Sequence, residues 1–452
     1  MQFNSINFPD ELIASLRASK CVVFAGAGIS RGKPASLPDF NELANLVADG
    51  SGEKRNENEL ADRFLGRIFR NGVAVHKRVS DLLNLPHGRF TPLHTNLVRL
   101  FSTRNSVRIV TTNYDSLFEE AATALFGESP EIYRSPALPL GSDFSGIVHV
   151  HGHLDHIKGM VVTDADFGRG YLTEGWARRF LVDLFRTYTV LFIGYSHEDI
   201  VLEYLSRALP ESAVGQRFAL IGEDVEQGEW LARGIKPISF TKPSELDYSV
   251  LNNAIKQLSD YLSRTILDWK RELTALAAVK PPQDEESDHQ IIDALSDKMK
   301  VRFFTNTATD KDWLSWLDSR GVLNNLFLDD RLDDRDLVLA NWLAKNYVFQ
   351  FPNELIFVIA NHGLKINYHF WLILGQEIGM DKESSDYLSP EALSKWISVL
   401  LSTYPSVTDD FVIGELGRRC SEAGNSNCLI ELFIKLVECH LEVKKGTNWL
   451  EG

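Results

Sequence analysis

The chain has 452 residues, of which 44% are hydrophobic and 24% charged, a composition typical of globular proteins with room for two or three domains. Its 47 lysines and arginines against 62 aspartates and glutamates give a net charge of −15, which argues against passive binding to bulk nucleic acid or anionic lipid. No apolar run approaches the roughly 18–20 residues of a membrane span, and four cysteines cannot build a disulfide framework, so we expect a cytoplasmic protein without membrane contact.

Alternating strands and helices are predicted over residues 20–265. Short apolar runs predict strands at residues 20–25, 107–112, 147–150, 189–193, 217–221 and 235–240. Stretches with helical periodicity lie between them at 115–125, 174–188 and 199–208, and an additional helical layer is expected at about 41–83. Buried strands separated by helices predict an α/β domain with a mostly parallel sheet covered on both faces.

A polar stretch divides the chain. Residues 280–290 read KPPQDEESDHQ, a composition typical of a linker. We therefore predict one domain over residues 1–270, an acidic, proline-containing linker over 271–290, and an all-α domain over 291–452. In the last domain a tryptophan recurs every 25–29 residues, which suits stacked helix pairs: Trp316, Trp342, Trp371 and Trp396. These side chains are either ordinary core residues or part of an interface that serves assembly and regulation.

Small or polar residues follow four of the predicted strands, at the edge where parallel sheets bind ligands. In chain order these strand ends carry Ala25, Gly26, Ala27, Gly28 and Ser30; then Thr112, Asn113 and Asp115; then His151; and finally Gly194 and Ser196. The glycines of the first group permit a tight turn and let backbone N–H groups approach a diphosphate. Each group alone suits a helix cap, a turn or a bend, but the four together predict one site.

The order of these motifs resembles that of the sirtuin (silent information regulator, SIR2-like) family. The motifs are GAGIS at 26–30, PDF at 38–40, TTNYD at 111–115, HG at 151–152 and GYS at 194–196. The resemblance covers about residues 15–245. It implies a Rossmann-like NAD-binding domain that cleaves the bond between nicotinamide and ribose, and it adds Asp39 and Phe40 to the expected NAD-binding residues.

One departure from the family is informative. No cysteine lies between Cys21 and Cys420, so the zinc module of protein-deacylating sirtuins is absent. The chain is more similar to bacterial sirtuin-like proteins that hydrolyse NAD in anti-phage defence by abortive infection. That resemblance implies a homo-oligomer, a phage-protein trigger, or a separate partner such as a helicase-type ATPase or an Argonaute-like protein.

The strand-end residues suit this chemistry. Departure of nicotinamide leaves an oxocarbenium-like ribose. Asn113 is expected to hold ribose hydroxyls or to position a water, Asp115 to accept a hydrogen bond from the carboxamide, and His151, with an ordinary pKa of about 6.5, to act as general base. Water as acceptor would give ADP-ribose and nicotinamide. The alternatives are a non-catalytic module that senses NAD or ADP-ribose, and a deacylase or ADP-ribosyltransferase.

Histidines around the HG motif also suggest a metal. His149, His151 and His153 would share one face of a continuous strand, and three histidines can hold zinc. However, Gly152 is expected to end the strand, and no paired motif completes a metalloenzyme signature. The sequence therefore predicts NAD as substrate and no metal.

Overall fold

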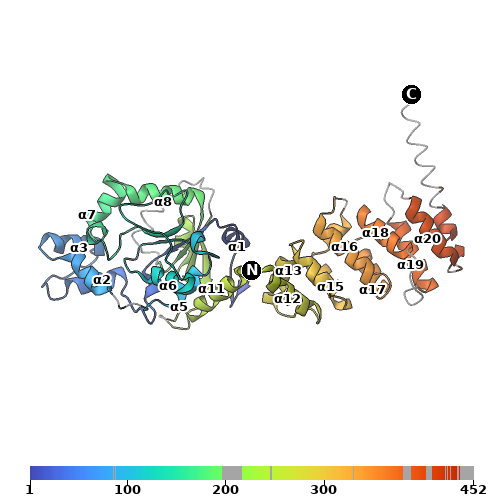
Figure 1. Cartoon of the computed structure of the whole chain (residues 1–452), viewed down its shortest axis with the longest axis horizontal. Helices are drawn as coiled ribbons and strands as arrows, with labels where there is room; N and C mark the ends of the chain where they lie inside the picture. The colour runs from blue at the N-terminus through green and yellow to red at the C-terminus, as the bar shows by residue number, and fades with distance from the viewer. Residues whose placement is uncertain are drawn as a thin grey trace, which may run out of the picture. The chain divides into compact units, whose positions relative to one another are not determined.

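The structure, a computed structural model, describes residues 1–84, 86, 88–195, 216–244, 247–328, 330–379, 388–403 and 410–422, and then 424, 426, 427, 429–434 and 437. The chain forms two compact units, Met1–Arg264 and Thr265–Gly452 (Figure 1). Within the described ranges, no helix is long and apolar enough to cross a membrane. The helix predicted over residues 199–208 lies outside these ranges.

The first unit is built on a seven-stranded sheet in which all neighbouring strands are parallel. In spatial order the strands are β5 (Ile132–Arg134), β6 (Gly146–His149), β4 (Arg108–Thr111), β3 (Cys21–Ala25), β7 (Thr189–Ile193), β8 (Arg217–Gly222) and β9 (Lys236–Phe240). The six predicted strands are present, each within one residue at either end. β5 was not predicted, because three half-buried residues at a sheet edge give no periodic signal.

The strand order opens a crevice at the carboxyl edge of the sheet. From β3 the chain moves outward through β4 to β6, and it later returns to the other side of β3 as β7. The strands are in close register there, since Val23 pairs with Ile109 on β4 and with Leu191 on β7. Where the order reverses, between β3 and β7, the two connections leave in opposite directions, and ligands bind at such switch points.

Helices cover both faces of the sheet (Figure 1). α8 (Trp176–Thr187) packs on one face, where its apolar side chains meet Phe24 and Phe192. On the opposite side lie α5 (Pro92–Val98), α6 (Leu117–Phe126) and α11 (Ser249–Leu262). This arrangement confirms the predicted Rossmann-like fold. The smaller elements of this unit are β1 (Gln2–Phe3), β2 (Ile6–Asn7), α1 (Asp10–Arg17), α7 (Asp164–Phe167) and α10 (Gln227–Ala232).

The additional helical layer is also present. It consists of α2 (Phe40–Ala48), α3 (Ala61–Arg70) and α4 (Val75–Leu83). Their apolar faces form a core of their own, which includes Leu43, Phe64 and Val79 and extends onto Tyr114 and Met160 beside the sheet. The layer therefore forms a wall next to the carboxyl edge of β4.

Helices are the regular elements of the second unit within its described residues. Its helices are α12 (Ile266–Ala277), α13 (Glu285–Leu295), α14 (Lys300–Thr305), α15 (Lys311–Ser319), α16 (Asp334–Tyr347), α17 (Pro352–Asn361), α18 (Tyr368–Gly379), α19 (Pro390–Ser402) and α20 (Asp410–Glu422). α14 contacts α12 and α16, α18 contacts α16 and α20, and α17 contacts α15 and α19. Each of these helices thus packs against the helices two positions away, as in the stacked helix pairs that the tryptophan spacing predicted.

The predicted linker differs from the structure. α12 and α13 occupy most of residues 271–290, and only 278–284 lie between them. The side chain of Asp284 caps α13 by accepting a hydrogen bond of 2.8 Å from the backbone N–H of Ser287. The polar residues that resembled a linker are therefore a helix cap and the first turn of a helix, a distinction that composition does not make.

The recurring tryptophans fill the core of the second unit. The indole N–H of Trp342 donates to the carbonyl of Ala308 at 2.7 Å, and that of Trp313 donates to Val279 at 2.9 Å, in both cases 34 positions earlier in the chain. Trp371 and Trp396 are equally buried and donate to other carbonyls. Trp316 is 6% exposed, and its indole N–H donates to the Asp288 carboxylate at 3.2 Å. Side chains buried in this way tie one helix pair to the next and are not available to a partner, so the interface alternative is wrong for the four recurring tryptophans.

We expect Trp342→Ala to lower the free energy of unfolding of the second unit by about 3–5 kcal/mol, because it leaves a cavity and an unpaired carbonyl. Chemical denaturation followed by circular dichroism measures the change. Phe357→Ala on α17 is the control, since that side chain is 64% exposed and its removal should change stability by less than about 0.5 kcal/mol. Equal losses in the two variants would contradict this account of the core.

Candidate functional site

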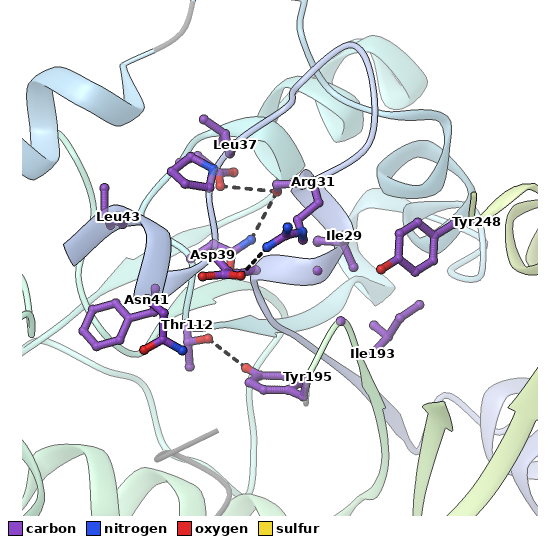
Figure 2. A pocket seen from close by; sticks show the side chains of 18 of the residues that line it. Ile29, Arg31, Leu37, Asp39, Asn41, Leu43, Thr112, Ile193, Tyr195 and Tyr248 are labelled. Carbon is purple, nitrogen blue, oxygen red and sulfur yellow. Dashed lines mark hydrogen bonds and ion pairs between the residues drawn. The ribbon is translucent and has the colours of Figure 1, made fainter. Parts of the chain in front are cut away.

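A cavity of about 440 Å³ lies at the carboxyl edge of the sheet (Figure 2). Ten of the thirteen predicted site residues line it: Ala27, Gly28, Ser30, Asp39, Phe40, Thr112, Asn113, Asp115, His151 and Gly194. Ala25 and Gly26 do not line it and instead belong to its floor, where the amide of Gly26 donates to the carbonyl of Ile193 at 2.9 Å. Ser196 lies outside the described residues.

The glycines after β3 and β7 bring two backbones into direct contact. The amide of Gly28 donates to the carbonyl of Gly194 at 2.9 Å, and a Cβ on Gly28 would lie 2.8 Å from the Cα of Gly194. Gly194 itself has φ +75°, a conformation that side chains disfavour. The loop continues into a single 3₁₀ turn, Ala27–Ser30, which is too short to supply the dipole of an α-helix to a phosphate. Here the glycines serve close packing of the chain.

Ser30 links polar side chains in the wall of the cavity. The side-chain amide of Asn113 donates to the Ser30 hydroxyl at 3.3 Å, and this hydroxyl donates to the Asp115 carboxylate at 3.5 Å. Nε2 of the buried His94 lies 3.3 Å from the same oxygen. The serine that the GAGIS motif predicted thus fixes the two residues of the TTNYD motif relative to the β3 loop.

Burial sets the protonation of the cavity wall. It raises the pKa of Asp115 to about 6 and lowers the pKa of His94 to about 3. It also lowers the pKa of His151 to about 3, against the ordinary value expected from the sequence. The ring of His151 packs against Phe167, and its Nε2 lies 2.9 Å from the hydroxyl of Tyr171. His151 is therefore neutral at pH 7 and can accept a proton, but burial makes it a weaker base than an ordinary histidine.

The histidines around His151 point elsewhere. β6 ends at His149, and the face that was weighed for a metal, His149 with His151 and His153, does not form. Instead, Glu119 of α6 lies between His149 and His153, 2.7 and 3.5 Å from their Nε2 atoms. Burial opposes the charges of this pair, but the attraction between Glu119 and His149 outweighs it, lowering the pKa of the carboxyl and raising that of the imidazole.

An ion pair spans one side of the cavity mouth (Figure 2). Arg31 contacts Asp39 and also donates to Glu42 at 3.0 Å. Asp39 caps α2 by accepting from the backbone N–H of Glu42 at 2.9 Å, so its role in this structure is to begin that helix. Across the cavity, the Tyr195 hydroxyl lies 2.9 Å from that of Thr112, joining the ends of β7 and β4.

Several cavity residues were missed by sequence reasoning: Arg31, Asp62, Tyr195 and Lys242. Asp62, on α3, is 5% exposed, and its Oδ1 has no hydrogen-bond partner among the residues that the structure describes. Lys242 follows β9 and pairs with Asp224 at 3.0 Å. Arg31 and Tyr195 adjoin predicted motifs and were within reach of the sequence. Nothing in the helical pattern around Asp62 distinguishes it from an ordinary first-turn acid.

We expect Gly28→Ala to lower the free energy of unfolding by about 1–3 kcal/mol, because the added methyl group overlaps the Gly194 backbone. Gly32→Ala, four residues later in the same loop, is the matched control, since its Cβ would meet no atom within 4 Å. Chemical denaturation of both variants measures the difference. A stable Gly28→Ala protein would show that the two strands do not need this close approach.

Asp115 should make stability depend on pH. Its folded pKa of about 6 exceeds its ordinary value near 3.8, so ionisation above pH 6 destabilises the folded state, and the penalty disappears below about pH 4. Asp115→Asn should therefore raise the unfolding temperature at pH 7.5 and have little effect at pH 4. Asp81→Asn, at an exposed position, should show no such trend. An equal change in unfolding temperature at both pH values would mean that ionisation of Asp115 does not destabilise the folded state.

Comparison with known proteins identifies one domain in the first unit. Residues 107–238, from the start of β4 into β9, match the sequence model of the SIR2-like domain. The chain is also 29% identical over 377 residues to "Uncharacterized protein y4cA" of Sinorhizobium fredii (strain NBRC 101917 / NGR234), a match that covers 75% of this chain and 30% of that protein. The chain thus spans less than a third of the length of this relative. Its first unit thus carries a SIR2-like domain on a Rossmann-like sheet.

Proposed function

We propose that the first unit hydrolyses NAD⁺ at the bond between nicotinamide and ribose, giving nicotinamide and ADP-ribose. The observation that carries this proposal is the convergence of His151, Asn113 and Asp115 on one cavity, beside the glycine loop of β3. The cavity volume of about 440 Å³ falls within the range usual for small-molecule sites. SIR2-like domains act on NAD, and this supports the choice of substrate.

The strand order supports an orientation for the dinucleotide. Asn113 and His151 follow β4 and β6 on one side of the switch point. On the other side, Gly222 ends β8 and Lys242 follows β9. The diphosphate would cross between them, at the contact of the β3 and β7 loops. We therefore assign the nicotinamide ribose to the Asn113 side and the adenosine to the Lys242 side.

The cavity wall suits a transition state with positive charge on the ribose. As the bond from C1′ to the nicotinamide nitrogen breaks, its electron pair leaves with nicotinamide, and C1′ becomes cationic. Asp115 and Asp62 are the buried carboxylates of the wall, and the charge of either would stabilise that cation. Water then bonds to C1′ and loses one proton, which neutral His151 would accept while Tyr171 orients its ring.

Asn113 contributes without adding charge. Its side-chain amide is fixed by the Ser30 hydroxyl, and its backbone carbonyl lies 2.9 Å from Nδ1 of His149. The amide oxygen is thereby left to accept from a ribose hydroxyl or from the attacking water. An NAD-sensing module would need the binding residues alone. The pairing of this amide with a neutral histidine in one cavity favours turnover over sensing.

The second unit would serve control or assembly, because its described residues do not contribute to the cavity. Loss of NAD harms a cell, so an NAD hydrolase needs a trigger. We therefore also propose that the protein acts in anti-phage defence, as a homo-oligomer or with a separate ATPase, Argonaute-like or phage protein. Light scattering of the full chain tests the homo-oligomer, and a monomer at micromolar concentration would exclude it.

We expect His151→Ala and Asn113→Ala each to slow nicotinamide release from NAD⁺ by about 10²-fold or more, the usual contribution of a general base or an essential positioning group. Chromatography of the products measures the rate, and unfolding temperatures show whether each variant is folded. His156→Ala is the control, because that histidine is exposed and does not line the cavity. Near-normal turnover in either cavity variant would refute the assigned roles, and absence of turnover in the unmodified chain under all triggers would refute the function.

A further inference from the structure

Behind the cavity, three metal-ligating side chains converge in the protein interior. His149 is the last residue of β6, His153 follows after a turn, and Glu119 reaches them from α6. Their side chains are 0%, 2% and 10% exposed, respectively. None of the three lines the cavity, so the proposed reaction does not use them.

The spacing of their ligand atoms is close to that around a bound metal ion. One ligand atom from each residue lies within 4.8 Å of the others. Oε1 of Glu119 is 2.7 Å from Nε2 of His149 and 3.5 Å from Nε2 of His153. A tetrahedral zinc ion with bonds of about 2.0–2.1 Å separates its ligand atoms by about 3.3 Å, a value between these two distances. Of the two distances to Glu119, the one to His149 would have to open, and by less than 1 Å.

The outer nitrogen of His149 is held as it is in a metal-bound imidazole. Nδ1 of His149 lies 2.9 Å from the carbonyl of Asn113, which can only accept, so Nδ1 carries the proton. Its Nε2 lone pair would then face a carboxylate oxygen, and a cation has to lie between them. A carbonyl or carboxylate on the second ring nitrogen is the usual support of a ligating histidine. Nδ1 of His153 accepts a hydrogen bond of 3.2 Å from the backbone N–H of Asp155, so its Nε2 carries the proton here, and a metal ion bound at Nε2 would displace that proton.

Glu119 gives the independent sign of a ligand. Its Oε2 is buried and has no hydrogen-bond partner within the described part of the chain. If the cation beside His149 were only a proton, the buried ion pair would satisfy Oε1 and leave Oε2 unpaired, at a cost that native interiors usually avoid. A metal ion bound by both carboxylate oxygens would satisfy the second one. The Ser116 hydroxyl, 3.0 Å from Nε2 of His153, is close enough to complete the coordination directly or through water.

We propose that Glu119, His149 and His153 bind one divalent transition-metal ion, with zinc as the best match to two imidazoles and a carboxylate. The site is closed and structural. It joins α6 to the turn after β6 and, through Nδ1 of His149, supports the backbone of Asn113 at the cavity wall. This inference replaces the expectation of a metal-free protein and is independent of the proposed NAD chemistry.

The experiment measures metal in the full chain, purified without an immobilised-metal column. Plasma mass spectrometry should find about one zinc per chain. Removal of zinc with a chelator should lower the unfolding temperature by at least about 4 °C, and ZnCl₂ alone should restore it. Protein loaded with Co²⁺ instead should show the intense visible absorption of a tetrahedral site.

Two variants and a control locate the site. Glu119→Gln and His153→Gln should lose most of the zinc and the response to ZnCl₂, whereas His156→Gln, at an exposed histidine in the same segment, should keep both. Circular dichroism distinguishes loss of metal from loss of fold. Metal-free unmodified protein whose unfolding temperature ignores ZnCl₂ would overturn the proposal, as would folded Glu119 and His153 variants that keep their zinc. Neither result depends on nicotinamide release, so this proposal and the NAD proposal fail separately.

Discussion

The contact between the loops of β3 and β7 is the constraint on which the rest of the site depends. The two strands are neighbours in the sheet but distant in the chain, and their carboxyl ends meet through the Gly28 amide and the Gly194 carbonyl at 2.9 Å. A Cβ on either glycine would overlap the other loop, so this close contact between the two backbones requires glycine at both positions. The space that this leaves above the edge becomes the cavity, and it lies where the strand order reverses.

Several titratable side chains around the cavity are buried, and burial and neighbouring charges determine whether each of them is charged. His94 and His151 have few charged neighbours, so burial leaves both neutral. Asp115 also resists ionisation, whereas Glu119 stays ionised because His149 lies 2.7 Å away. Within the described part of the chain, Asp115 in the cavity wall thus has no ion-pair partner, whereas Glu119 behind the wall is paired with His149. A ligand that brings or develops positive charge would be attracted to the first without disturbing the second.

The sequence predicts best what local pattern determines. Strands with β-branched residues ending in glycine, asparagine or histidine give both the sheet and the rim, because in a parallel sheet every carboxyl end lies at one edge. Contacts that depend on tertiary packing could not be predicted from the sequence. Glu119 meets His149 only through the docking of α6 on the sheet, 30 positions away in the chain. The side chain of Asp284 looked like part of a linker because a cap and a linker share the same composition.

The segment that matches the SIR2-like domain does not contain the whole cavity. Residues 107–238 include Asn113, Asp115 and His151, but the glycine loop of β3 and Asp62 of the helical layer lie before them. The matched segment alone would contain Asn113, Asp115 and His151 but would lack the β3 loop and the helical layer that complete the cavity. The sheet makes the site whole, because β3 pairs with both β4 and β7 and so carries the earlier residues to the same edge. In the assembled fold, residues from inside and outside the family match therefore enclose one cavity.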